Sequence, residues 1–130
     1  MPLAPTRAVI ILIDIDTNRY TMAPMSPIWF QILLALADAD RHGIAIMQEV
    51  LERTQGNMRL WPGMLYRNLQ KLEAERLIEE IDSATGPMAG SPRFFRLTAA
   101  GRRACAAEAR RLATYVDAAR EKQLFNKKSR

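Results

Sequence analysis

A chain of 130 residues with 48% apolar and 25% charged side chains has the size and composition of one globular domain. The net charge of +5 is uneven, because residues 1–60 carry 5 basic and 6 acidic side chains and residues 61–130 carry 14 and 8. This asymmetry favours a polyanionic partner, nucleic acid before a membrane surface. No apolar run approaches the ~20 residues of a membrane span. The single cysteine, Cys105, excludes an internal disulfide and suits a cytoplasmic protein.

Residues 1–24 are the least informative part of the chain. Residues 9–15 are β-branched enough for a strand, but the nearby sequence offers no strand partner. We interpret residues 1–24 as a loosely attached extension, and Met22 and Met25 are alternative starts of the domain. An ordered edge strand or arm is the other interpretation.

The pattern of residues 25–98 predicts three short helices followed by a β-hairpin. Ser26 is a natural N-cap and Pro27 suits the first helical position. The polar segment Asp38–Gly43, which includes His42, is predicted to be a turn. The predicted helices span 27–39, 44–54 and 62–76, and the predicted strands span 77–82 and 93–97 around a loop at 83–92. Helices in this order before a hairpin indicate a mainly α, winged helix-turn-helix domain.

The helix predicted over residues 62–76 has two different faces. Leu65, Leu69 and Leu72 recur at helical spacing and form an apolar stripe. The opposite side carries long hydrogen-bond donors beside small residues, namely Arg67, Gln70 and Lys71 with Gly63 and Ala74. We predict that this side enters the major groove of DNA. An ordinary solvated amphipathic helix is the alternative.

These side chains have the chemistry that DNA recognition needs. Arg67 can chelate guanine O6 and N7, and Gln70 can pair with the edge of adenine. Lys71 would position the domain on phosphates. The helix N-terminus at residues 62–64 offers free N–H groups to a phosphate. A dimer would place two such helices ~34 Å apart in successive major grooves.

A last helix is predicted from Ala99 to about Phe125, with Thr98 as its N-cap. Small and apolar residues recur along it with a period near 3.5, which suits a partner helix. The residues of this seam are Cys105, Ala109, Leu112, Val116 and Ala119, with Tyr115 beside it. Residues 99–130 are therefore predicted to be a dimerisation helix with a basic tail. A helix folded back on its own domain is the alternative.

Three runs of the sequence resemble the PadR family of transcriptional regulators. They are RHGIAIMQEV (41–50), PGMLYRNLQKLEAERLIEE (62–80) and RFFRLTAAGRRA (93–104). The resemblance covers roughly residues 28–122. It implies a winged helix-turn-helix that dimerises through its C-terminal helix and represses at palindromic operators of double-stranded DNA. It also implies release by a small effector such as a phenolic acid or a drug.

The resemblance also implies roles for single residues. Tyr66 matches a tyrosine that meets the DNA backbone, Arg67 and Lys71 match positions that face DNA, and Arg93 matches a basic wing position. The alternatives are packing against the wing for Tyr66 and plain solvated surface for Arg67 and Lys71. The chain departs from the family pattern at Met64, often Thr or Ser, at Trp61, often a small capping residue, and at the arginine-poor wing tip 86–92.

Two tryptophans are candidates for a small aromatic effector. Flat side chains such as Trp29 and Trp61 can line a pocket, whereas the simpler interpretation places Trp29 in the core and Trp61 as a lid at a helix start. The chain has one histidine, one cysteine and no Gly-rich phosphate loop after a strand, so no catalytic, metal or cofactor site is expected. The alternatives to an effector-controlled repressor are an effector-independent repressor and a winged helix used only for protein contact.

Overall fold

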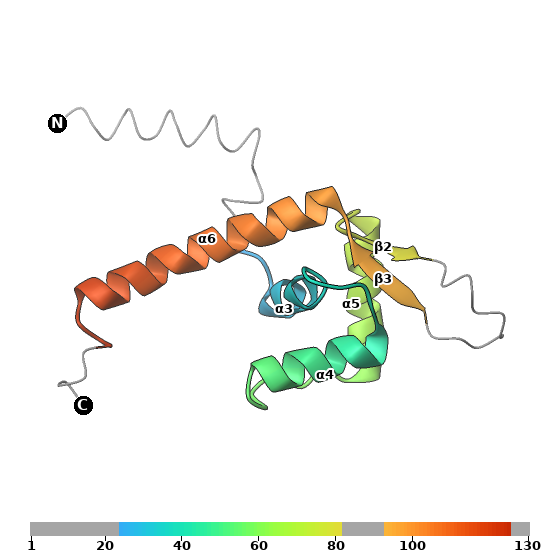
Figure 1. Ribbon diagram of the computed structural model, residues 1–130, viewed down its shortest axis with the longest axis horizontal. Coiled ribbons are helices and arrows are strands. Elements are labelled where there is room, and N and C mark those ends of the chain that lie inside the picture. Colours follow the sequence, from blue (N-terminus) through green and yellow to red (C-terminus); the bar gives the residue numbers. More distant parts are fainter. Residues whose placement is uncertain (1–23, 82–92, 126–130) are drawn as a thin grey trace. The chain divides into compact units, whose positions relative to one another are not determined.

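The computed structural model describes residues 24–81 and 93–125, which fall into two units. The larger unit is Ser26–Cys105, and the smaller unit contains Pro24, Met25 and the chain after Cys105. Residues 1–23 of the predicted N-terminal extension, the wing tip 86–92 and the end of the basic tail lie outside the described residues. Figure 1 labels the elements, which are α3 (Pro27–Ala35), β1 (Arg41–His42), α4 (Gly43–Arg53), α5 (Pro62–Ala74), β2 (Ile78–Ile81), β3 (Phe94–Leu97) and α6 (Ala99–Glu121).

Helix α3 is held at both ends by side chains. Ser26 accepts a hydrogen bond from the backbone N–H of Trp29 at 3.3 Å, and Pro27 occupies the first turn, as predicted. The helix ends at Ala35, earlier than the predicted end near residue 39. Nε of Arg41 donates to the Ala35 carbonyl at 2.7 Å. A cation there satisfies a carbonyl that the helix end leaves open and complements the helix dipole.

The residues before α4 form a strand, and the prediction of a turn up to Gly43 was wrong there. Strand β1 pairs antiparallel with Phe94 and Phe95 of β3, which gives a three-stranded sheet in the order β1-β3-β2. His42 then caps α4, because its Nδ1 accepts the backbone N–H of Ala45 at 3.2 Å. A two-residue strand has no periodicity of its own, so the turn-like residues 38–40 dominated the prediction.

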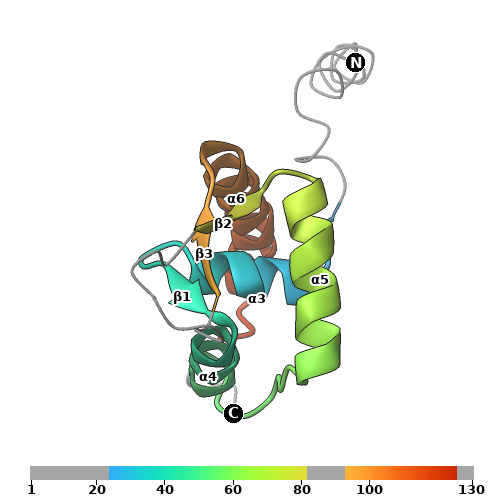
Figure 2. The same ribbon diagram turned by 90° about the vertical axis from the view of Figure 1, so that its right-hand side faces the viewer.

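The core of the larger unit lies where the three helices and the sheet meet. Figure 2 shows α3 between the sheet and α5, with α4 below. The largest fully buried side chains are Ile32, Leu33, Ile46, Val50, Leu65, Leu69, Leu72, Ile78 and Phe95. Because the three leucines of α5 point into this core, its opposite side must face outward.

Helix α4 buries a different face from the predicted one. Val50 is buried as expected, but Met47 and Leu51 are only half-buried, and Ile46 takes the innermost place instead. The helix is therefore apolar on two sides, since Ile44 on the outer side is also a large apolar residue.

Thr98 and Gly101 join the end of α5 to the start of α6. The Thr98 hydroxyl donates to the Arg76 carbonyl at 2.8 Å and accepts the Gly101 N–H at 2.9 Å, which confirms Thr98 as the N-cap. Arg76 lies in the left-handed region, with φ of 62°. A Cβ on Gly101 would collide with the backbone carbonyl of Leu77, so this approach of the two segments requires glycine.

The smaller unit contains a buried ion pair on α6. The Glu108 side chain, 3% exposed, accepts hydrogen bonds from Arg111 at 2.9 and 2.5 Å and from the Met25 N–H at 3.3 Å. Arg111 also donates to the Tyr115 hydroxyl at 2.9 Å. The hydrogen bonds from Arg111 lower the pKa of Glu108 although burial opposes them.

None of the helices in the described ranges is long and apolar enough to cross a bilayer.

Candidate nucleic-acid interface

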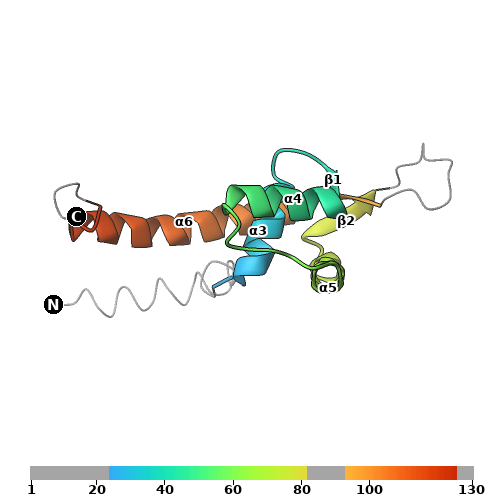
Figure 3. The same cartoon turned by 90° about the horizontal axis from the view of Figure 1, so that it is seen from below.

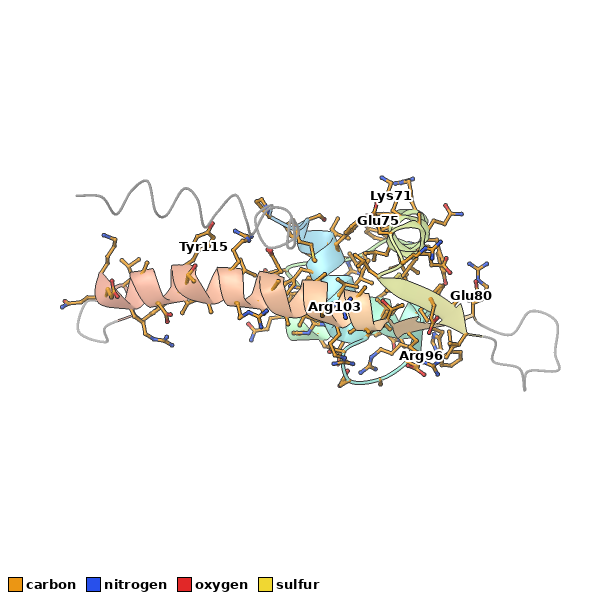
Figure 4. The ribbon with its side chains drawn as sticks, turned by 90° about the horizontal axis from the view of Figure 1, so that it is seen from above. Lys71, Glu75, Glu80, Arg96, Arg103 and Tyr115 are labelled. Atoms are coloured by element: carbon orange, nitrogen blue, oxygen red, sulfur yellow. The ribbon has the colours of Figure 1, made fainter. Side chains whose placement is uncertain are left out.

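The outward side of α5 presents the side chains that the sequence placed there. Arg67, Gln70 and Lys71 are all exposed, and Figure 4 shows Lys71 extending from α5 away from the sheet. Within residues 24–81 and 93–125, none of the three makes a side-chain hydrogen bond or an ion pair. Their donors are therefore available to another molecule. The one acidic residue of α5, Glu73, lies in its last turn, and Glu75 is the C-cap that follows.

Tyr66 lies against the start of α4, where its phenol meets Gly43. A Cβ on Gly43 would collide with the phenol hydroxyl of Tyr66, so glycine makes room for this ring. Tyr66 is nevertheless 40% exposed. The contact holds the phenol at the edge of the surface formed by α5.

The N-terminus of α5 has no side-chain cap, because Trp61 occupies the N-cap position. The first free N–H groups of the helix belong to Gly63 and Met64, since Pro62 has none. Nothing lies within 4 Å of the position that a Cβ on Gly63 would take. The packing of the chain therefore gives no reason for glycine at this exposed position. Met64 is half-buried.

The wing arginines are engaged with nearby acidic residues. Arg93 is ion-paired with Glu80 at 3.2 Å and lies over the Phe95 ring at 5.9 Å. Arg96 contacts Asp40 at 3.4 Å and Glu79 at 3.8 Å, and Figure 4 shows Glu80 and Arg96 at the sheet. The charge of Arg93 is therefore partly balanced, in contrast to that of Arg67 and Lys71.

The two tryptophans have different surroundings. The indole N–H of Trp29 donates to Oδ1 of Asn68 at 3.1 Å, and Nδ2 of Asn68 donates to the Met64 carbonyl at 2.8 Å. These bonds tie α3 to α5. Trp61 is 61% exposed and lies under the guanidinium of Arg59, 5.5 Å from the ring centroid. Sequence reasoning missed Arg59 and Asn68. A cation two residues before Trp61 was the signal for Arg59, and no pattern pointed to Asn68.

The seam predicted on α6 is only partly open. Cys105 is buried within the chain, whereas Ala109, Tyr115 and Val116 are exposed, and Leu112 and Ala119 are half-buried. The seam that remains accessible therefore begins at Ala109. The described residues hold no cluster of His, Cys, Asp or Glu that could bind a metal ion.

Residues 32–107 match the model of the transcriptional regulator PadR-like family, which is more than half of the chain. The chain belongs to the PadR-like family. This confirms the family and the winged-helix fold expected from the sequence. The chain is also 40% identical over 82 residues to an uncharacterized 37.1 kDa protein in transposon TN4556 of Streptomyces fradiae. That match covers 63% of this chain and 22% of the length of that protein.

Solved structures share the fold of this chain. A PadR family transcription regulator from hypervirulent Clostridium difficile superposes with a TM-score of 0.62 at 20% identity, over 74% of this chain and 97% of that one. RosR of H. salinarum superposes with a TM-score of 0.58 at 23% identity, over 70% of this chain and 76% of that one. At these identities the likeness establishes the fold.

Proposed function

We propose that this chain is a dimeric transcriptional repressor that reads palindromic DNA through α5 and is released by a small effector. The observation that carries the proposal is the outward side of α5. Three exposed donors, Arg67, Gln70 and Lys71, have no partner among the described residues, while the apolar side of the helix is fixed in the core. A surface of unengaged cations is the electrostatic footprint of a nucleic-acid-binding domain.

The remaining contacts follow from the geometry around α5. The uncapped N-terminus at Gly63 and Met64 can donate its free N–H groups to a phosphate. Gly63 would let the DNA backbone approach closely, since nothing in the chain occupies the space beside it. Tyr66 would donate to a phosphate from the edge of the same surface. Arg93 would exchange Glu80 for a phosphate, so we assign it a smaller share of the affinity.

Dimerisation places two copies of α5 on one duplex. The accessible part of the seam supports a twofold partner: Ala109, Tyr115 and Val116 are exposed, and Leu112 and Ala119 are half-buried. Repression, a palindromic site and release by an effector are what the family resemblance implies, and a cytoplasmic location follows from a chromosomal target. Of the two tryptophans, Trp61 is the better effector contact, because the indole N–H of Trp29 is already bonded within the domain.

The test measures binding to DNA selected by the purified protein from a random duplex pool. We expect Arg67→Ala to weaken binding to the selected site by about 1–3 kcal/mol and to relax the specificity at one base pair. Lys71→Ala should weaken binding to all duplexes similarly. It should also reduce by about 1 the slope of the logarithm of the binding constant against the logarithm of the salt concentration. Lys122→Ala, which removes the same charge from the C-terminal end of the chain, is the matched control and should change neither property.

The outcome separates the competing functions. A winged helix used only for protein contact would show no salt-dependent affinity for any duplex. An effector-independent repressor would bind the selected DNA but would not respond to small aromatic molecules. Unchanged affinity in Arg67→Ala would overturn the role of α5 in reading the bases.

A further inference from the structure

The outer side of α4 carries three apolar residues that the core leaves exposed or only half-buried. Ile46 and Val50 point into the core, yet Ile44, Met47 and Leu51 follow one another at spacings of three and four on the other side. Ile44 is 55% exposed. Contiguous apolar surface of this kind marks a binding site more often than single exposed apolar residues do.

This surface forms one wall of a groove. Figure 3 shows α4 beside the loop that leads into α5, and the space between them has a volume of about 280 Å³. Leu60 is buried behind it, and the exposed ring of Trp61 stands at its edge. The complete lining is Ile44, Met47, Gln48, Leu51, Arg59, Leu60, Trp61 and Pro62. The volume lies just below the range of roughly 300–1,000 Å³ for drug-sized ligands, so it suits a small molecule.

One end of the groove is positively charged. Arg59 is exposed, and within the described residues its guanidinium contacts the Trp61 ring but no carboxylate. Pro62, which begins the uncapped helix α5, also lines the groove, and the helix dipole is positive at this N-terminus. None of the described residues that line the groove is acidic. Gln48 supplies a neutral amide that can donate or accept a hydrogen bond.

We propose that this groove binds a small organic anion with a flat apolar body. The body would lie against Trp61, Met47 and Leu51, and the anionic group would pair with Arg59. Apolar contact supplies most of the binding free energy, and the single cation orients the ligand. A neutral molecule of the same shape would bind more weakly.

The groove also has a consequence for DNA, which rests on the proposed function. Arg59 and the start of α5 are the groups that the anion would occupy, and the same helix start would donate to a DNA phosphate. Anion and duplex would therefore weaken each other's binding by the same factor.

Two indole N–H signals give a direct readout of the groove in a nitrogen-15 NMR spectrum. We expect 1-naphthoate to move the Trp61 signal and to leave the Trp29 signal in place. Trp61→Phe assigns the two signals. Arg59→Gln should weaken 1-naphthoate about tenfold, the loss of ~1.4 kcal/mol expected for a partly exposed charged hydrogen bond. Binding of the neutral 1-naphthalenemethanol should change less than twofold in the same variant.

A second variant keeps the test independent of a folding defect. Ile44→Glu replaces an exposed side chain at the groove wall and should abolish the response to both probes, while an unmoved Trp29 signal reports an intact domain. An unresponsive Trp61 signal at millimolar 1-naphthoate would overturn the proposal. If Arg59→Gln lowered the affinity for both probes equally, the charge of Arg59 would have no role in binding the anion.

The titration contains no DNA, so its failure is distinct from failure of the proposed function. If 1-naphthoate binds the groove, its ability to displace the selected duplex is then measured by fluorescence anisotropy. Displacement by 1-naphthoate in the wild type but not in Ile44→Glu supports the coupling, and displacement in both overturns it.

Discussion

Glycine occurs twice beside the proposed DNA-reading surface, in opposite surroundings. Gly43 faces the phenol of Tyr66, and any side chain there would displace the ring. Gly63 faces open space, with nothing within 4 Å of the position of a Cβ. The first glycine is explained by contacts inside the domain. The second has no such explanation, although glycine within a helix costs roughly 0.5–1 kcal/mol relative to alanine.

Gly63→Ala should therefore separate folding stability from DNA affinity. We expect the free energy of unfolding to stay the same or to rise by up to about 1 kcal/mol, because alanine favours the helix. Affinity for the selected duplex should fall by about tenfold, or ~1.4 kcal/mol, because the added methyl group would meet the DNA backbone. Urea denaturation and fluorescence anisotropy measure the two quantities. Undiminished DNA affinity would remove Gly63 from the interface.

The elements that could be predicted from the sequence were those long enough to show an apolar periodicity of their own. The leucine stripe of α5 identified its inner side, and hence Arg67, Gln70 and Lys71 on the outer side. Strand β1 could not be predicted, because its two residues gain their structure by pairing with β3 far along the chain. The inward face of α4 was misassigned for a related reason: the helix has two apolar sides, and periodicity does not say which one is buried.

Gly101→Ala tests the junction between α5, the hairpin and α6. The added Cβ would collide with a backbone carbonyl, that of Leu77, which cannot move aside as a side chain can. We expect a loss of about 1–3 kcal/mol in the free energy of unfolding, the usual cost of overpacking. Urea denaturation measures it, and Gly63→Ala is the control at an open position. A variant as stable as the wild type would contradict the close approach.

The ion pair on α6 should make the free energy of unfolding depend on pH below the ordinary pKa of glutamate. The pKa of Glu108 is lowered in the folded chain by the hydrogen bonds from Arg111. A lowered pKa stabilises the fold above the unfolded value of about 4.3, and this stabilisation is lost as the pH falls through the folded value. Glu108→Gln should remove the effect, so its free energy of unfolding should vary less than that of the wild type between about pH 5 and pH 2. Equal pH dependence of the two proteins would assign the acid sensitivity to other groups.

Across the whole chain, the two units differ in how far their apolar side chains are buried. The larger unit has a closed core built from α3, α4, α5 and the sheet. In the smaller unit, Tyr115, Val116, Leu124 and Phe125 are exposed. Tyr115 and Val116 lie on α6, and Leu124 and Phe125 follow its end at Glu121. Exposed apolar side chains on a helix are stabilised when a second helix covers them. Cys105 is already buried, so the proposed contact with a second copy begins one turn later, at Ala109.

Val116→Asp should convert the proposed dimer into a monomer, because it places a charge in the centre of the accessible seam. Thr114→Asp adds the same charge on the opposite side of α6 and should leave the dimer intact. Sedimentation velocity distinguishes the two states. Loss of the dimer should also lower affinity for a palindromic duplex by about 100-fold, since each half-site would then bind separately, while affinity for a single half-site should not change. If Val116→Asp and Thr114→Asp sediment alike, the apolar seam does not join two copies, and α5 would have to find a palindrome as a monomer.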